Sequence, residues 1–118
     1  MLSSISSSLS ALNAFGTKMA VSANNVANIE SEEFKKSRAD LSEGFNSTVQ
    51  VEITQIDSPG NIVFEPDNTG QMVEKELSNV DLAEEFPQTM VAQRGYEANL
   101  KFIKVQDDMI GSVIDILG

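Results

Sequence analysis

The sequence predicts a mainly α-helical protein with a small β insert, in which the N- and C-terminal helices pair antiparallel as a coiled coil and short antiparallel strands lie between them. Three observations support this prediction: a seven-residue apolar repeat at each end of the chain, alternating apolar residues in the middle, and an uneven distribution of charge. Of the 18 acidic and 8 basic residues, only Lys18 lies within residues 1–29. We therefore expect an N-terminal helix within 1–29, a linker and small β region at 30–77, and a C-terminal helix within 78–118.

The N-terminal helix is indicated by two series of mostly apolar residues with a period of seven. The first series comprises Leu2, Leu9, Gly16 and Ala23, and the second comprises Ile5, Leu12, Met19 and Val26. Such a repeat keeps one narrow face toward a partner helix, and the small residues of the first series would let that helix approach closely. The alternative interpretation is an amphipathic helix on an ordinary globular core.

The C-terminal helix carries a similar but less apolar repeat. One series comprises Leu82, Thr89, Tyr96, Ile103, Ile110 and Leu117, and the other comprises Phe86, Gln93, Leu100, Asp107 and Ile114. Asp81 and Glu84 suit a helix start, because a short acceptor caps the first amides and an acid complements the helix dipole. Pro87 has no backbone N–H and predicts a kink or a restart in the second turn.

The large apolar members of these repeats form the predicted helix-pairing seam. They are Leu2, Ile5, Leu9, Leu12, Met19 and Val26 in the first helix, and Leu82, Phe86, Tyr96, Leu100, Ile103, Ile110, Ile114 and Leu117 in the second. At a rise of 1.5 Å per residue, helices of roughly 27 and 37 residues would run about 40 and 55 Å.

Alternating residues between the helices predict three short strands. Val49, Val51 and Ile53 alternate with polar residues, and clusters of Gly, Pro, Asp and Asn mark turns. The expected strands cover 49–53, 61–64 and 72–77, with turns at 57–60 and 67–70. These strands would form a meander, whose apolar face needs a helix or a neighbouring molecule to cover it.

The composition argues against several classes of function. The chain has no cysteine and no histidine, which removes thiol nucleophiles, Ser–His pairs and the usual zinc ligands. No pair of acids stands out as a catalytic dyad, so we expect no enzyme, no cofactor and no metal site. The net charge of −10 repels nucleic acid. The longest apolar runs are triplets, too short to span a membrane, and the N-terminus lacks the pattern of a cleaved secretory signal.

Blocks of sequence near both ends carry a resemblance to a known family. They are Ser22-Ala23-Asn24-Asn25-Val26-Ala27-Asn28 with Phe34-Lys35-Lys36, Ser78-Asn79-Val80-Asp81-Leu82-Ala83-Glu84-Glu85-Phe86, and Val91-Ala92-Gln93-Arg94-Gly95-Tyr96-Glu97-Ala98-Asn99. In order and position they closely resemble the bacterial flagellar rod and hook protein family, over about residues 1–40 and 75–118. The resemblance implies an axial structural protein, whose terminal helices pair and stack with neighbouring subunits into a tube. It also implies passage through the flagellar export apparatus without cleavage.

The short middle region makes the chain most like a proximal-rod component. Two positions depart from the family pattern, since Glu33 stands where the family usually has a glycine and Pro87 falls in what is normally uninterrupted helix. We expect six polar residues to contact neighbouring subunits, namely Asn24, Asn25, Asn28, Gln93, Arg94 and Asn99. Local capping is the alternative role of the first three, and a solvated helix face is the alternative for the others.

We interpret the chain as a structural subunit of the flagellar rod, in the periplasmic part of the basal body. Its expected partners are copies of itself, other axial subunits and, in transit, the export apparatus. The alternative is a soluble adaptor or export-apparatus-binding module that uses the same helices. A free-standing coiled-coil dimer with no flagellar connection is a third interpretation, which would require the motif matches at both ends to be accidental.

Overall fold

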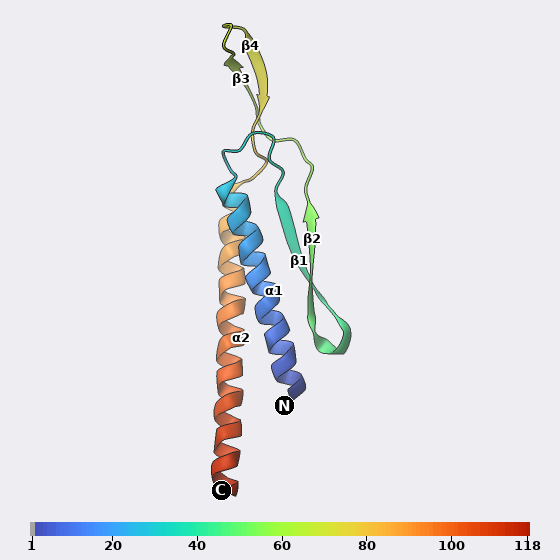
Figure 1. The fold of residues 1–118 in the computed structure, drawn as a ribbon, viewed down its shortest axis with the longest axis vertical. Helices are drawn as coiled ribbons and strands as arrows, with labels where there is room; N and C mark the ends of the chain where they lie inside the picture. Colours follow the sequence, from blue (N-terminus) through green and yellow to red (C-terminus); the bar gives the residue numbers. More distant parts are fainter. Residues whose placement is uncertain (1) are drawn as a thin grey trace.

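Two long helices and two small hairpins form an elongated molecule of 81 × 24 × 20 Å (Figure 1). The computed structural model describes the backbone of residues 2–118 and the side chains of residues 3–118. The helices are α1 (Leu2–Ala27) and α2 (Leu82–Leu117), and the strands are β1 (Ser37–Glu43), β2 (Val49–Gln55), β3 (Ile62–Pro66) and β4 (Met72–Glu76). The predicted fold class is confirmed. The side chain of Leu2, a predicted seam residue, lies outside the described part.

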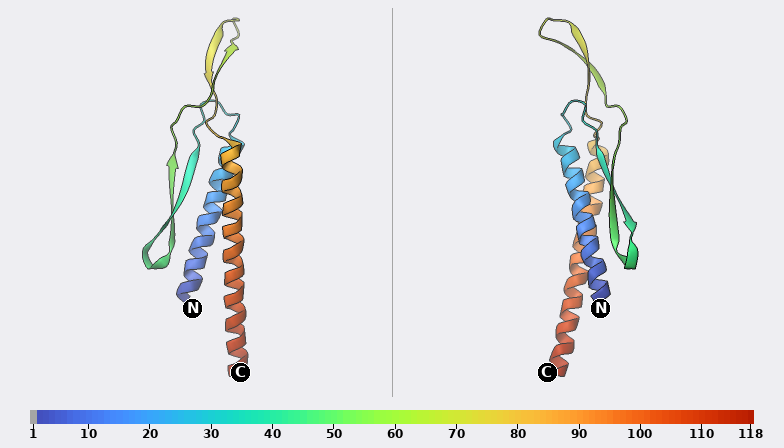
Figure 2. Two further views of the ribbon diagram at one scale, coloured as in Figure 1. Left: turned by 180° about the vertical axis from the view of Figure 1, so that it is seen from behind. Right: turned by 45° about the vertical axis from the view of Figure 1, so that its right-hand side comes forward.

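The helices α1 and α2 run antiparallel and pack against each other, and α2 extends beyond the N-terminal end of α1 (Figures 1 and 2). Asp81 caps α2 as expected, because its carboxylate accepts a hydrogen bond from the Ala83 N–H at 2.9 Å. The helix does not restart at Pro87. A proline this close to the helix start removes a single backbone hydrogen bond, and α2 continues as one helix to Leu117.

The strands form two separate two-stranded sheets, so the predicted meander is wrong. Strand β2 pairs antiparallel with β1, and β3 pairs antiparallel with β4. The residues expected to form a hairpin turn, 57–60, instead connect one hairpin to the other. Strand β1 was not predicted, because Ala39 and Leu41 are its only apolar residues, too few to show a clear alternation.

The first hairpin covers one side of α1, while the second stands clear of the helices (Figure 2). Alternation on β1 and β2 turns Ala39 and Leu41 toward α1, opposite Ile53 and Val51 of the partner strand. The buried apolar side chains are few and mostly small: Ala11, Leu12, Ala14, Ala39, Val80 and Ala92. The core is therefore a thin layer in which α1 lies between α2 and the first hairpin.

The turn after α1 keeps a left-handed residue without a glycine. Glu33 has a φ of 56°, and its N–H donates to the Glu76 carbonyl at 3.1 Å. This backbone conformation costs an ordinary residue about 1 kcal/mol or more. The glycine usual for the family would adopt this conformation freely. The chain therefore has a left-handed residue at this position although Glu33 stands in place of the glycine.

The second hairpin is joined to the rest of the chain by a neck, which consists of residues 56–61 and 77–81. The backbones of these two segments cross closely at Gly60. A Cβ at this position would lie 1.9 Å from the Leu77 carbonyl oxygen. The neighbouring Leu77 N–H donates to the Asn61 carbonyl at 2.8 Å. Only glycine allows this crossing.

We expect Gly60→Ala to separate the two neck segments at a cost of about 2 kcal/mol. Amide hydrogen exchange at Leu77 should accelerate, because its hydrogen bond spans the crossing. Gly70→Ala is the comparison, since no atom lies within 4 Å of a Cβ there and only its positive φ of 83° adds cost. Unchanged Leu77 exchange in Gly60→Ala would contradict the steric role of Gly60.

Candidate assembly interface

The face of α2 that packs against α1 is lined by small and polar side chains. Its buried residues are Glu85, Ala92 and Gln106, which are separated by multiples of seven. On α1 the buried polar residues are Ser8, Ser22 and Asn25. The small side chains, such as Ala92 and Ser22, permit close helix packing, and the polar ones bury little apolar area. Within the described side chains, the Gln106 Oε1 is a buried acceptor with no hydrogen-bond partner.

Glycines let aromatic rings fit between the helices at mid-length. A Cβ on Gly95 would lie 2.5 Å from two atoms of the Phe15 ring, so this ring occupies the space that a side chain on α2 would need. On α1, a Cβ on Gly16 would lie 4.0 Å from the Tyr96 ring. The close approach expected at Gly16 is thus present, with Tyr96 opposite it.

The predicted seam residues fall into two groups in the single chain. Leu12 is buried, and six others are partly buried: Ile5, Met19, Val26, Tyr96, Ile103 and Ile110. The remaining six are exposed: Leu9, Leu82, Phe86, Leu100, Ile114 and Leu117. On α2 the buried series that includes Glu85 and Ala92 lies one residue before the predicted series that includes Phe86 and Gln93. The role of the exposed members stays a prediction.

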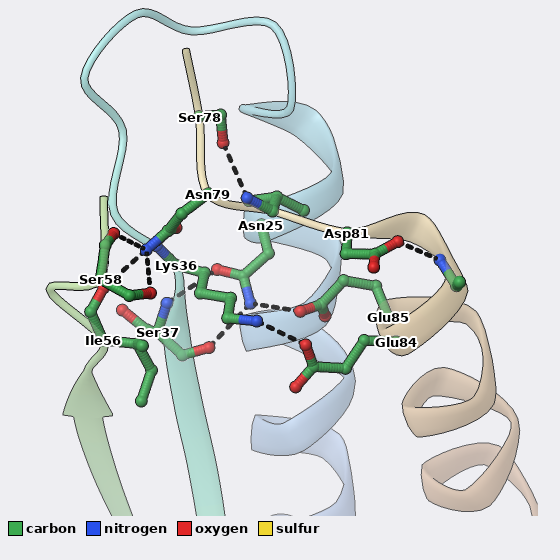
Figure 3. A network of polar contacts seen from close by, with 12 residues as sticks. Asn25, Lys36, Ser37, Ile56, Ser58, Ser78, Asn79, Asp81, Glu84 and Glu85 are labelled. Atoms are coloured by element: carbon green, nitrogen blue, oxygen red, sulfur yellow. Dashed lines mark hydrogen bonds and ion pairs between the residues drawn. The ribbon is translucent and has the colours of Figure 1, made fainter. Parts of the chain in front are cut away.

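Asn25 joins three elements where the helices meet the first hairpin (Figure 3). Its Nδ2 donates to the Ser37 carbonyl at 2.7 Å and to Glu85 Oε1 at 3.1 Å. Its Oδ1 accepts from the Ser37 N–H at 3.0 Å. The side chain is 2% exposed, and its amide satisfies β1 and the buried carboxylate of α2 together. Asn25 is therefore a structural bridge within the chain.

Asn79 makes a second bridge, between the segment that precedes α2 and the two ends of the first hairpin. Its Oδ1 accepts from the Lys36 N–H at 2.7 Å, and its Nδ2 donates to the Ile56 carbonyl at 2.7 Å. A further bond at 2.9 Å reaches the Ser58 carbonyl. The Lys36 ammonium pairs with Glu84 on α2 (Figure 3). These contacts fix β1 against the helix pair.

A cavity of about 170 Å³ lies beside this network, between α1, β1 and the first turns of α2. Its charged groups are largely paired, since Lys36 binds Glu84 and Arg38 binds Asp40. Lys18 and Ser22 also line it. The described residues contain no cluster of acidic, cysteine or histidine side chains that could hold a metal ion.

The second hairpin is held to the neck by Glu76. Its carboxylate pairs with the Lys35 ammonium and accepts from the Gly60 N–H at 2.9 Å. Lys35 first, and then the Gly60 amide, hold the pKa of Glu76 below its ordinary value of 4.5. Because the folded pKa is depressed, these contacts stabilise the neck at higher pH, and the stabilisation is lost as the pH falls through the folded pKa.

We therefore expect acidification below pH 4.5 to loosen the neck. The Gly60 amide chemical shift should titrate with a midpoint below that value, because protonation of Glu76 weakens its bond to this amide. In Glu76→Gln this titration should disappear. A Gly60 shift that stays flat across acid pH in the unmodified chain would contradict the assignment.

The six residues expected to contact neighbouring subunits differ in their accessibility. Asn25 is buried, as described above. Asn28 donates to the Asn24 carbonyl at 2.9 Å and to its Oδ1 at 2.7 Å, which satisfies the end of α1 locally. Asn99 donates to the Gly95 carbonyl at 2.8 Å. The exposed members are Asn24, Gln93 and Arg94, of which Gln93 donates to Glu97 at 3.2 Å.

Three residues that hold this region together were not predicted from the sequence. Glu85 was not singled out but is buried, and no local signal separates it from the exposed neighbour Glu84. Gly95 was not singled out, and no local signal separates it from Gly111, where no atom lies within 4 Å of a Cβ. Asn79 lies outside both helices, and only the fold brings the backbone groups that it binds together.

Large apolar side chains are exposed along most of α2. Twelve of them are at least 36% exposed: Leu82, Phe86, Met90, Val91, Leu100, Phe102, Val105, Met109, Val113, Ile114, Ile116 and Leu117. They occupy more than one face of the helix, so α1 can cover only a part of them. Apolar surface of this extent on a monomer marks an interaction site. Neither described helix is apolar enough over a sufficient length to cross a membrane.

Comparison with known proteins gives matches at both ends of the chain. Residues 5–35 match the family model "Flagella basal body rod protein", and residues 71–116 match "Flagellar basal body rod FlgEFG protein C-terminal". A stretch of 41 residues is 42% identical to the flagellar basal-body rod protein FlgG of Bacillus subtilis (strain 168). That alignment covers 35% of this chain and 16% of the relative. The matched segments contain nearly all of α1 and α2, and the chain belongs to the flagellar basal body rod protein family.

Proposed function

We propose that the protein is a structural subunit of the flagellar rod, in the periplasmic part of the basal body, and that it assembles with copies of itself and with other axial subunits. The flagellar export apparatus would carry it there without cleavage of a signal peptide. The family membership supports the location. The single observation that carries the assembly role is the exposed apolar surface of α2.

The distribution of burial in the helix pair supports this proposal. Contacts between α1 and α2 use small and polar residues such as Ala92 and Gln106, whereas the large side chains of Phe86, Leu100 and Ile114 are exposed. Exposed apolar area costs free energy in water and is favourable to bury. Neighbouring subunits that cover these side chains would supply the core that the single chain lacks.

The proposed function is mechanical and needs no catalytic group. Helices of 26 and 36 residues are about 39 and 54 Å long at 1.5 Å per residue. Stacked subunits with helices of this length would overlap along a common axis and resist twisting. We propose Asn24, Gln93 and Arg94 as polar contacts between subunits, and the exposed seam residues as apolar contacts.

Assembly can be tested with a variant of the exposed seam. Leu100→Asp combined with Ile114→Asp should leave the circular dichroism of the dilute chain unchanged, because both side chains are exposed in the monomer. The same variant should fail to restore motility to cells that lack the protein. Leu100→Met with Ile114→Met is the matched control and should restore motility.

Normal motility with both aspartates, in cells that incorporate the variant at the unmodified level, would overturn the proposed role of this surface. A stable one-to-one complex with an export component, without self-assembly at any concentration, would instead favour the adaptor.

A further inference from the structure

A second apolar stripe runs along α2 beside the face that packs on α1. It consists of Val91, Ala98, Phe102, Val105, Met109 and Ile116, and all six are exposed. The large ones are at least 50% exposed. Three of the members, Val91, Ala98 and Val105, are spaced by seven, and the others, Phe102, Met109 and Ile116, form a second series of seven. This is the repeat of a helix that packs against another helix.

A column of charges lies along the side of this stripe that is remote from α1. It consists of Arg94, Lys101, Asp108 and Asp115, each seven residues from the next. The opposite flank contains the buried residues Ala92 and Gln106, so the column faces solvent. All four charges are exposed, and none forms an ion pair within residues 3–118.

When two copies of this column run in opposite directions, each basic residue of one copy lies opposite an acidic residue of the other. Two basic residues are followed by two acidic residues at equal spacing. Helices that pack antiparallel through such a repeat bring the same flank of each helix together, whereas parallel helices bring opposite flanks together. In a parallel pair, Arg94 and Lys101 would meet the uncharged flank that contains Asn99 and Gln106. Only the antiparallel arrangement pairs the charges.

We propose that this stripe binds a second copy of the chain, with the two α2 helices antiparallel about a two-fold axis near residue 104. Arg94 then lies opposite Asp115 of the second copy, and Lys101 lies opposite Asp108 of the second copy. The two-fold axis repeats both pairs, giving four ion pairs. The same register places Phe102 against Val105 of the second copy, Ala98 against Met109, and Val91 against Ile116, so that large side chains meet smaller ones at the central layers.

This dimer goes beyond the proposed function and does not depend on it. A two-fold interface closes on itself and cannot extend into a filament, so this dimer is distinct from assembly into a rod. The dimer covers the stripe in the free protein, and its formation can be measured in dilute solution without any rod component.

Charge reversal in the full chain tests the register. Lys101→Glu should raise the dimer dissociation constant about tenfold in sedimentation equilibrium at low salt, because two ion pairs become like-charge contacts. Asp108→Lys should have a similar effect. The double variant Lys101→Glu with Asp108→Lys should recover most of the affinity. Residues 101 and 108 are two helical turns apart within one chain, so the recovery reports a contact between chains.

Asp107→Lys is the matched control for Asp108→Lys. It makes the same change of charge at an exposed neighbouring position, but on the side of α2 opposite the stripe, and should leave dimerisation nearly unchanged. A purely monomeric chain, a double variant no tighter than either single variant, or an equal effect of Asp107→Lys would each overturn the proposal.

Orientation can be tested separately because the chain has no cysteine. A mixture of Val91→Cys and Ile116→Cys chains should form a cross-linked heterodimer under mild oxidation, while neither variant should link to itself. Self-linking of Val91→Cys without mixed product would indicate parallel helices and overturn the proposal. Loss of rod assembly in cells with the dimer intact would affect the proposed function alone.

Discussion

Asn25→Ala is expected to destabilise the chain by about 3 kcal/mol. The substitution removes both hydrogen-bond donors of Asn25 Nδ2, leaving the Glu85 carboxylate buried without its amide partner. It also removes the acceptor of the Ser37 N–H. A buried charge that loses its partner keeps its desolvation penalty. Urea unfolding followed by circular dichroism should show a lower midpoint with an unchanged slope.

Two further variants separate this bridge from general effects of substitution. Asn24→Ala, on the exposed side of the same turn, should change stability by no more than about 0.5 kcal/mol. Asn25→Leu combined with Glu85→Leu should recover the part of the loss that comes from the buried carboxylate, while the Ser37 backbone groups still lack their partner. An Asn25→Ala chain as stable as Asn24→Ala would show that the bridge contributes little.

Gly95→Leu is expected to force the helices apart and to cost about 2–3 kcal/mol. The Phe15 ring fills the place of the new side chain, with its atoms 2.5–2.7 Å from the position of a Cβ. The ring cannot remain there, and its displacement would open α1 from α2 and from the first hairpin, whose residues Leu41 and Val49 line a pocket with Phe15. Thermal unfolding should shift to lower temperature.

Gly111→Leu is the matched control, since no atom lies within 4 Å of a Cβ at that position of the same helix. Leucine has a higher helix propensity than glycine, so this variant should gain up to about 0.8 kcal/mol. Opposite signs for the same substitution at two glycines of α2 are the expected result. Stabilisation by Gly95→Leu would contradict the packing of Phe15 against α2.

The sequence alone predicted the helices, the cap at Asp81 and the family, because these depend on short-range patterns. A repeat of seven, a capping carboxylate and the motif blocks each lie within one segment of the chain. The strands 49–53 and 72–77 were located for the same reason, since they match β2 and β4 closely. Such signals need no knowledge of which segments meet.

The tertiary structure decided which surfaces meet. Apolar residues lie around much of α2, so their period could not identify the face that packs on α1. The contact with α1 is made at the small residues Ala92 and Gly95, whereas the predicted seam was drawn from large apolar residues. Strand pairing was equally undetermined, because β1 carries too few apolar residues to reveal itself as the partner of β2. Asn25 and Glu85 are 60 residues apart in sequence, and their contact arises only when the folded chain brings the two helix ends together. Local periodicity sets the secondary structure of each segment, whereas the choice among faces is made by the steric fit and hydrogen bonding of residues distant in sequence.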